Sequence, residues 1–507
     1  MFLARLSLRL RLRKKPRREL PRLPPEIWVA IMRCAAEPSG PFTGPHGRLD
    51  SPVSFLDVSS DHADLLRRLA VYRAALGCKA TMSRVCRHWH LWAQELLYEF
   101  IWISRARQAR ALAAALALNN DLGPCIRRLH IETFTLERCD PGDLRTIIEH
   151  APRLAAYSDY RSIRRQPYSS PDHLLASLAR PGNTLKRLSW TNYDYDRRDQ
   201  SGCISFFLRL SPALGRTASE LDYLELSLCA TNLVKPQLPT SALSPVIPVD
   251  LPALRTLKLT LDNITFSVLS HWTLPSLQNL SVLSTDFSYT GDGFALFFQV
   301  HGHNIVQLEL GHSTGAIEEY YLTSHAVHRL QPSPSSNLAA WCPNLREFIC
   351  SAHAEWNWQS PDWIAPHLLL PAHPNLRLIA VRDMNKRLLD DLELFLVRRS
   401  DRLRPGHGPF FRLAEQIRSL LRSDAFPQLQ IIRDMSWESA LMRRVQRMPL
   451  PQDPMRFDVW DMLPHSTNLD EIDFGKSLSA FWKNVGDNCA TRGVQVQDWT
   501  GQTCYTN

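Results

Sequence analysis

Residues 251–282 read LPALRTLKLTLDNITFSVLSHWTLPSLQNLSV. In this stretch an apolar residue is followed by two others, a second apolar residue, one other and a third apolar residue, once at 254–259 and again at 277–282. A proline stands two residues before each copy, where it ends the preceding element and is tolerated at the start of a strand. Apolar residues at alternate positions predict a short β-strand with one buried face.

The same pattern returns along most of the chain. Its copies begin at Ile126, Leu154, Leu185, Leu221, Leu254, Leu277, Ile305, Leu345, Leu376, Leu429 and Leu469. The mean step of about 34 residues is longer than the usual repeat of 20–29. Because the steps are also uneven and no asparagine ladder stands out, the sequence indicates an irregular repeat.

The segments between the copies have leucine and isoleucine at helical spacing, for example 143–150 and 410–422. A short strand cannot bury its apolar side alone, whereas parallel strands stacked with helices on the outer side bury a continuous core. We therefore predict an α/β protein in which residues 105–475 form an irregular leucine-rich-repeat solenoid of parallel strands alternating with helices. Residues 476–507 are predicted to be a C-terminal cap or tail.

The net charge of +9 is concentrated at the beginning of the chain. Residues 1–18 contain 8 of the 59 lysines and arginines and no acidic residue, which leaves 51 basic against 50 acidic residues. A nearly neutral body gives no reason to bind nucleic acid, and no stretch approaches the ~20 apolar residues of a membrane span. Residues 1–20 are predicted to be a disordered basic tail, with a nuclear import patch or a mitochondrial presequence as alternatives.

The sequence shows no spacing typical of a metal or cofactor site. The eleven cysteines and eighteen histidines form neither a C-x-x-C pair nor a zinc-like cluster, and there is no phosphate-binding loop. Without a secretory signal, the cysteines are expected to be reduced thiols. We therefore expect no metal, no cofactor, and a cytoplasmic or nuclear location.

Residues 21–104 are predicted to form a small helical module. The stretch LPPEIWVAIMRCAA at 23–36 has prolines where a helix begins and then apolar residues along one helical face. Residues 37–60 are rich in proline, glycine and serine and are predicted to be a loop insertion. A second helix is expected to stop at Gly77, and a third amphipathic stretch follows it.

This module resembles an F-box, in the form common in fungal F-box proteins. LPPEIW at 23–28 matches the opening Leu-Pro-x-Glu-hydrophobic of that family. SRVCRHWHLWAQELLYEFIWI at 83–103 contains its Val-Cys-x-x-Trp, followed by Leu-Leu-Tyr-Glu. An F-box followed by leucine-rich repeats is also a familiar architecture, so the two halves support each other.

The resemblance implies that the module docks on the Skp-family adaptor of an SCF-type (cullin–RING) ubiquitin ligase, while the repeats hold a protein substrate. The adaptor-binding residues that it implies are Leu23, Pro24, Glu26, Ile27, Ile31, Val85, Cys86, Trp89, Leu96 and Leu97. Val85 lies 62 residues after Leu23, which is farther than the family usually has. Docking survives if the insertion at 37–60 folds away from the docking face, and is in doubt if the insertion covers it.

A solenoid binds its partners on the concave face, which is lined by the variable strand residues. Here these candidates are mixed in charge: Lys186, Glu225, Lys258, Gln307 and Glu309. A second candidate is the pair Trp356 and Trp358, since exposed tryptophans are frequent binding hot spots. The alternative for these tryptophans is that they pack a loop onto the solenoid.

These patterns predict a substrate-recognition subunit of a ubiquitin ligase that carries no catalytic residue of its own. One alternative is a repeat scaffold without a ligase link, in which the N-terminal helices only cap the solenoid. A more remote alternative is a serine hydrolase, because GHSTG at 311–315 matches a nucleophile elbow with Ser313 as the nucleophile. The plainer interpretation of that motif is a glycine-flanked turn after a repeat strand.

Overall fold

The computed structural model describes residues 23–36, 52–57, 65–133, 137–160, 162–163, 172–180, 184–193, 202–228, 247–261, 263–284, 292–312, 338–352, 370–391, 410–445 and 471–504. In these residues twelve strands form one sheet, in which the order in space follows the order in the chain from β1 to β12. All neighbouring strands are parallel. The strands are β1 Phe100–Ile103, β2 Arg128–Ile131, β3 Ala156–Asp159, β4 Arg187–Tyr193, β5 Tyr223–Leu228, β6 Thr256–Leu261, β7 Asn279–Ser284, β8 Gln307–His312, β9 Glu347–Ser351, β10 Leu378–Arg382, β11 Ile431–Asp434 and β12 Gln495–Gln497.

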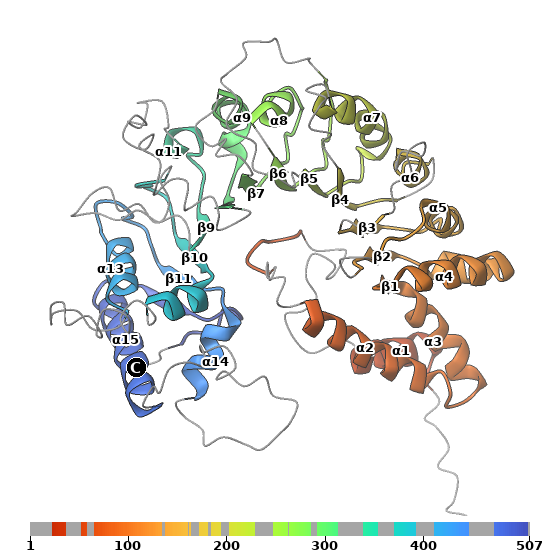
Figure 1. Cartoon of the computed structure of the whole chain (residues 1–507), viewed down its shortest axis with the longest axis horizontal. Helices are drawn as coiled ribbons and strands as arrows, with labels where there is room; N and C mark the ends of the chain where they lie inside the picture. Colours follow the sequence, from red (N-terminus) through yellow and green to blue (C-terminus); the bar gives the residue numbers. More distant parts are fainter. Residues whose placement is uncertain are drawn as a thin grey trace, which may run out of the picture.

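The sheet curves into an arc with the strands on its inner side and most helices on its outer side (Figure 1). The helices between the strands are α4 Ala106–Leu118, α5 Pro141–His150, α6 Asp172–Leu178, α7 Gly202–Thr217, α8 Asn263–Leu269, α9 Asp292–His301, α11 Leu338–Trp341, α13 Phe411–Leu420, α14 Trp437–Val445 and α15 Glu471–Thr491. Local sequence sets their ends. In α5, for example, the Asp140 side chain accepts a hydrogen bond from the Gly142 amide, and Pro141 occupies the first turn.

The repeated apolar residues form the core between the sheet and the outer helices. Leu257 of β6 stands opposite Leu224 of β5 and Leu280 of β7, and all three are completely buried. Strand residues alternate between the two faces of the sheet. The residue between two buried leucines of one strand, such as Lys258 between Leu257 and Leu259, therefore points to the inner side of the arc. The predicted parallel α/β solenoid is therefore confirmed as an architecture.

Ten of the eleven predicted repeat strands correspond to strands in the described residues. The copy that begins at Leu469 is wrong, because Ile472 and Phe474 belong to helix α15. Apolar residues three apart also suit a helical face, so that pattern did not discriminate. Two strands escaped the pattern, β1 and β12, and they extend the sheet beyond the expected limits of 105 and 475 into the segments assigned to the module and to the cap.

A short ladder of polar side chains ties successive repeats together, contrary to the expectation that no ladder exists. The residue directly before the first apolar position of four copies donates to a carbonyl of the preceding repeat. The pairs are Ser276 Oγ with Pro252 O (2.6 Å), Asn304 Nδ2 with Pro275 O (3.3 Å), Asn344 Nδ2 with His303 O (2.7 Å) and Asn375 Nδ2 with Pro343 O (2.9 Å).

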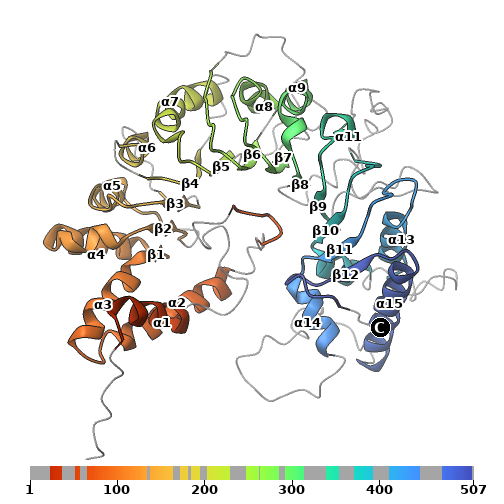
Figure 2. The same ribbon diagram turned by 180° about the vertical axis from the view of Figure 1, so that it is seen from behind.

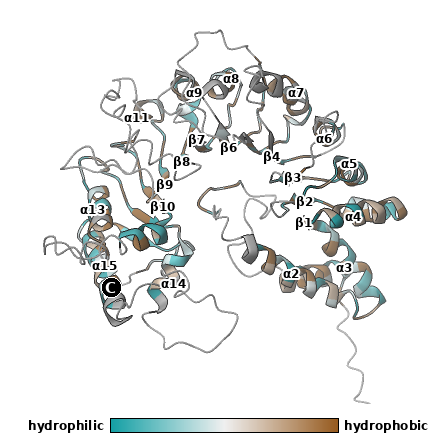
Figure 3. Ribbon diagram, in the orientation of Figure 1, coloured by the Kyte–Doolittle hydropathy of each residue, from teal (hydrophilic) through white to brown (hydrophobic). Residues whose placement is uncertain are grey.

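Residues before the first strand contain three helices, α1 Pro25–Ala36, α2 Leu65–Met82 and α3 Arg87–Glu99. They show hydrophobic and hydrophilic residues on the same helix (Figure 3). Helix α3 leads directly into β1, and the Trp102 amide of β1 donates to the Tyr72 hydroxyl of α2 at 3.2 Å. The helical module is therefore continuous with the first edge of the sheet.

The sequence predicted that the second helix ends at Gly77. This prediction is wrong, because α2 continues to Met82. A Cβ added at Gly77 would meet nothing within 4 Å, so this glycine occupies an open, exposed part of the helix. Glycine weakens a helix interior by about 1 kcal/mol relative to alanine, which does not suffice to stop one that packs on its neighbours.

Among the described residues, no helix has both the length and the apolar character needed to cross a membrane. Nor do the described parts of the chain bring three or more histidine, cysteine or acidic side chains together in a group that could hold a metal ion.

Candidate protein-binding surfaces

The inner face of the arc presents two rows of side chains that are neighbours across the parallel strands. The first row, from β4 to β8, contains Ser189, Glu225, Lys258, Ser281 and Glu309. The second row, from β5 to β9, contains Tyr223, Thr256, Asn279, Gln307 and Glu347. Four of the five predicted concave residues are in these rows. Lys186 is not, because it precedes β4, and the row position there belongs to Arg187.

The charges of Glu225 and Lys258 pair with each other. The Lys258 Nζ lies 2.9 Å from Glu225 Oε1, and the Tyr223 hydroxyl donates to Glu225 Oε2 at 3.1 Å. Burial alone would raise the pKa of Glu225, but the Lys258 ammonium and hydrogen bonds from Lys258, Ser189 and Tyr223 bring it below its ordinary value. Glu225 is therefore an ionised, satisfied carboxylate.

Glu309 is neutralised in the same way, by an arginine two strands further on. The Arg382 guanidinium of β10 donates to Glu309 Oε1, and the Ser281 hydroxyl donates to Glu309 Oε2 at 2.7 Å. Beside it, Gln307 Nε2 donates to Glu347 Oε2 at 2.6 Å. Sequence reasoning missed Arg382, because it stands at the end of β10 and outside the repeated pattern.

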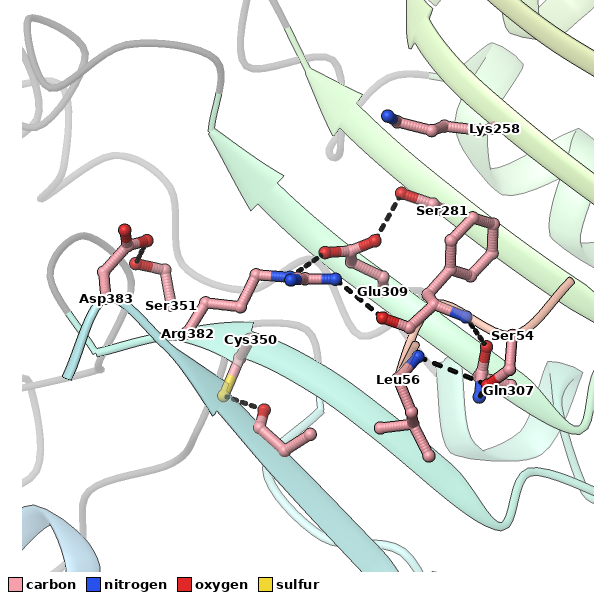
Figure 4. A network of polar contacts seen from close by, with 12 residues as sticks. Ser54, Leu56, Lys258, Ser281, Gln307, Glu309, Cys350, Ser351, Arg382 and Asp383 are labelled. Atoms are coloured by element: carbon pink, nitrogen blue, oxygen red, sulfur yellow. Dashed lines mark hydrogen bonds and ion pairs between the residues drawn. The ribbon is translucent and has the colours of Figure 1, made fainter. Parts of the chain in front are cut away.

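A segment from the predicted insertion lies on this face. Residues 52–57, with the sequence Pro-Val-Ser-Phe-Leu-Asp, lie inside the arc and far from the outer helices (Figures 1 and 2). Thr256 Oγ1 and Asn279 Nδ2 both donate to the Val53 carbonyl at 2.9 Å. The Phe55 amide donates to Gln307 Oε1 at 2.7 Å, and the Phe55 carbonyl accepts from Arg382 at 2.8 Å. Figure 4 shows the part of this network around Gln307, Glu309 and Arg382.

The same segment buries an apolar pair. Phe55 is 1% exposed and Leu56 8% exposed, although neither belongs to a helix or strand. Together with Val53 they form a separate hydrophobic cluster on the inner side of the sheet, against Tyr223, Ile349, Leu378 and Ala380. The sequence left open whether the insertion folds away or covers the docking face. Of this insertion the structure describes residues 52–57, toward its C-terminal end, and these cover part of the concave face of the solenoid.

The first edge of the inner face is closed by the helical module. His130 of β2 contacts Ser158 Oγ at 2.7 Å and Glu132 Oε2 at 3.0 Å, and the Trp102 ring lies edge-on to it. Arg68 of α2 pairs with Glu132 at 3.3 Å. Burial lowers the pKa of His130, and the Glu132 carboxylate opposes this only partly.

A second candidate surface lies on the N-terminal helices. The predicted apolar face of α1 points outward, because Leu23, Ile27 and Ile31 are 38%, 46% and 45% exposed. The residues that α1 buries are Met32 and Ala36. Trp28 packs against the rings of Trp89 and Trp92 of α3, with centroids 5.6 and 6.4 Å away.

The other residues implied by the family resemblance divide into three groups. Pro24, Glu26, Val85 and Cys86 are exposed, and Val85 reaches 56%. Cys86 is also the N-cap of α3, because its sulfur accepts a hydrogen bond from the Trp89 amide. Trp89 and Leu97 are half-buried. Leu96 is 1% exposed, so it belongs to the core of the module and not to its surface.

Three candidates of the sequence lie outside the described residues. They are Trp356, Trp358 and Ser313, and the described range that precedes Ser313 ends at His312, the last residue of β8.

No family model and no curated protein matches this chain. Among solved structures, the chain is similar to the crystal structure of the Rad7 and Elc1 complex in yeast, with 14% sequence identity. The likeness covers 75% of this chain and 94% of that chain, with a TM-score of 0.19. A TM-score this low does not show a shared fold, and the solenoid is established by the register of its own strands.

Proposed function

We propose that this chain is a substrate-recognition subunit of an SCF-type ubiquitin ligase. In this proposal the helical module docks on a Skp-family adaptor, and the concave face of the solenoid holds a protein substrate. The chain positions the substrate and catalyses nothing itself. It works in the cytoplasm or the nucleus, where its cysteines stay reduced.

The observation that carries the adaptor half is the distribution of exposed apolar side chains. Ten large hydrophobic side chains of the described residues are exposed, and five of them lie directly before α1, on the N-terminal helices or in the turn between α2 and α3. These are Leu23, Ile27, Ile31, Val85 and Leu91. An apolar surface gathered on a small module is typical of a partner-binding site.

A specific observation also favours the scaffold alternative. Helix α3 continues into β1, and Tyr72 of α2 accepts a hydrogen bond from the Trp102 amide of β1. Arg68 of α2 pairs with Glu132, directly after β2, so the module covers an edge that any solenoid must protect. A cap needs no adaptor. The two functions differ in what the outward face of α1 does.

Co-expression of the full chain with a Skp-family adaptor, followed by purification on a tag, separates them. The proposal expects a stoichiometric complex with the intact chain. The variant with Ile27→Glu and Ile31→Glu should lose the complex, because two charges would then face an apolar partner surface. Both side chains are exposed, so the variant should keep its fold by circular dichroism.

The matched control carries Leu118→Glu and Leu208→Glu, which places the same two charges on exposed positions of α4 and α7. This control should retain the adaptor. If the intact, folded chain forms no complex, the ligase role is wrong and the scaffold function takes its place.

A further inference from the structure

We propose that the concave face from β6 to β10 is a binding site for a short peptide that forms a turn after its serine, which residues 52–57 fill in cis. The partner is a protein segment in which a serine is followed by an aromatic and an aliphatic residue. This inference rests on the proposed function for its statement that such a segment belongs to a substrate. The peptide site itself does not depend on the adaptor.

The segment crosses the strands in order. The Val53 carbonyl is bound at β6 and β7, by Thr256 and Asn279. The Phe55 amide is bound at β8 by Gln307, and the Phe55 carbonyl at β10 by Arg382. Three backbone groups of one short segment therefore form hydrogen bonds with side chains from four strands of the solenoid.

Recognition is directed at the backbone and at an apolar pair. Two carbonyls and one amide accept or donate the hydrogen bonds, while Phe55 and Leu56 fill the apolar cluster. Two polar side chains of the segment also interact. Ser54 Oγ accepts from Gln307 Nε2 at 2.9 Å and from the Leu56 amide at 3.2 Å. The Asp57 carboxylate interacts electrostatically with Arg433 of β11. Hydrogen bonds to the main chain, combined with contacts to a few side chains, are a common way for proteins to bind peptides.

The receptor side is organised by residues of the solenoid itself. The Ser281 hydroxyl and the Arg382 guanidinium both donate to the Glu309 carboxylate, and Gln307 Nε2 donates to Glu347. The groups that bind the segment are thus fixed by partners other than the segment. A site that is fixed in this way binds a ligand without first ordering its own side chains.

A tethered occupant weakens the binding of a free peptide. Residues 52–57 lie between α1 and α2 in the chain. Because they are joined to the solenoid covalently, their effective concentration at the concave face is high. A free peptide binds only those molecules whose concave face is empty. Its apparent affinity is therefore the intrinsic affinity multiplied by the fraction of empty molecules. A substrate must therefore displace the segment.

The test uses the full chain and a fluorescein-labelled peptide with the sequence of residues 50–59, DSPVSFLDVS, followed by fluorescence anisotropy. The variant with Phe55→Ala and Leu56→Ala removes the two side chains that fill the apolar cluster, so residues 52–57 should leave the concave face empty. It should bind the peptide about tenfold or more tightly than the intact chain does. A peptide with alanine in place of its phenylalanine and leucine should bind neither protein.

A third protein adds Thr256→Val and Asn279→Ala to the emptied variant, which removes both donors to the Val53 carbonyl. Peptide binding should again fall by about tenfold. The proposal is overturned if the emptied, folded variant binds no better than the intact chain. It is overturned as well if the emptied variant does not fold, because residues 52–57 would then be core and not ligand.

Adaptor co-purification of the same variants keeps the two proposals apart. Peptide binding without an adaptor complex would leave the peptide site standing and remove the ligase role. An adaptor complex without peptide binding would do the reverse.

Discussion

At the scale of single residues, the charges of the concave face act on each other. The sequence offered Glu225, Lys258 and Glu309 as contacts for a partner, yet Glu225 pairs with Lys258, and Glu309 with Arg382. A buried charge whose partner is in the same protein has little left to offer a ligand. Apart from the Arg382 guanidinium, which also donates to the Phe55 carbonyl, the groups that bind residues 52–57 are neutral, such as the hydroxyl of Thr256.

Histidine burial gives a prediction about pH. Burial lowers the pKa of His301 to about 4, although a hydrogen bond to the Leu269 carbonyl favours the charged ring. Between about pH 6.5 and 4 the unfolded chain binds a proton that the folded chain does not, so stability falls as the pH falls through this window. At pH 5 this histidine should cost about 2 kcal/mol relative to pH 8.

The measurement is the urea midpoint at pH 8 and pH 5 for the intact chain and for His301→Gln. The variant should lose less stability between the two pH values, because its side chain does not titrate. His303→Gln is the matched control, since His303 is exposed on the next turn. An equal effect of both substitutions would contradict the prediction.

At the scale of the element, the turn before a repeat strand controls how closely repeats stack. Gly123 and Gly302 each stand three residues before the first apolar position of a copy, in a short 3₁₀ turn. A Cβ at Gly123 would lie 1.8 Å from the His150 carbonyl oxygen, and one at Gly302 would lie 2.6 Å from that of Trp341. Both glycines therefore allow the helix end of the next repeat to approach.

Three glycine-to-alanine variants test this packing. Gly123→Ala and Gly302→Ala should each destabilise the chain by about 1–3 kcal/mol, because the backbone of the neighbouring repeat must move. Gly77→Ala, in the open part of α2, should instead stabilise it by about 0.5–1 kcal/mol. Thermal denaturation of the three proteins gives the sign of each change, and destabilisation by Gly77→Ala would show that its surroundings are not open.

At the scale of the whole molecule, residues 52–57 provide contacts that a solenoid ordinarily lacks. Each repeat of a solenoid contacts only its neighbours along the stack. Here one segment reaches Tyr223 of β5 and Leu378 of β10 through the same apolar cluster, and its ends lead to α1 and α2. The inner segment thus joins repeats that are not adjacent.

Hydrogen exchange should report this link. In the variant with Phe55→Ala and Leu56→Ala, amides of β6 to β10 should exchange about tenfold faster or more, because two buried side chains are truncated. Amides of β2 and β3, which lie at the other end of the arc, serve as the internal control and should keep their rates. A uniform increase over all strands would indicate general destabilisation and contradict the link.

The sequence by itself determined the repeat and its direction. Alternating leucines after a proline, with helical spacing between them, allow few arrangements that bury every apolar face, so ten strands and the parallel order could be predicted. The copy at Leu469 was wrong because short apolar patterns suit a helix as well as a strand. Strand β12 was missed because its three residues contain a single apolar side chain, Val496. Ile27 and Ile31 were found as a helical face, but their outward direction was not encoded locally.

Only the tertiary structure decided what the inner face binds. Local patterns describe neighbours a few residues apart, whereas Phe55 meets Gln307 across 252 positions of the chain and Arg382 across 327. No periodicity predicts such a contact, because it depends on the curvature of the whole arc. For the same reason, Lys186 and Arg187 could not be told apart as inner residues until the register of β4 against β5 was known.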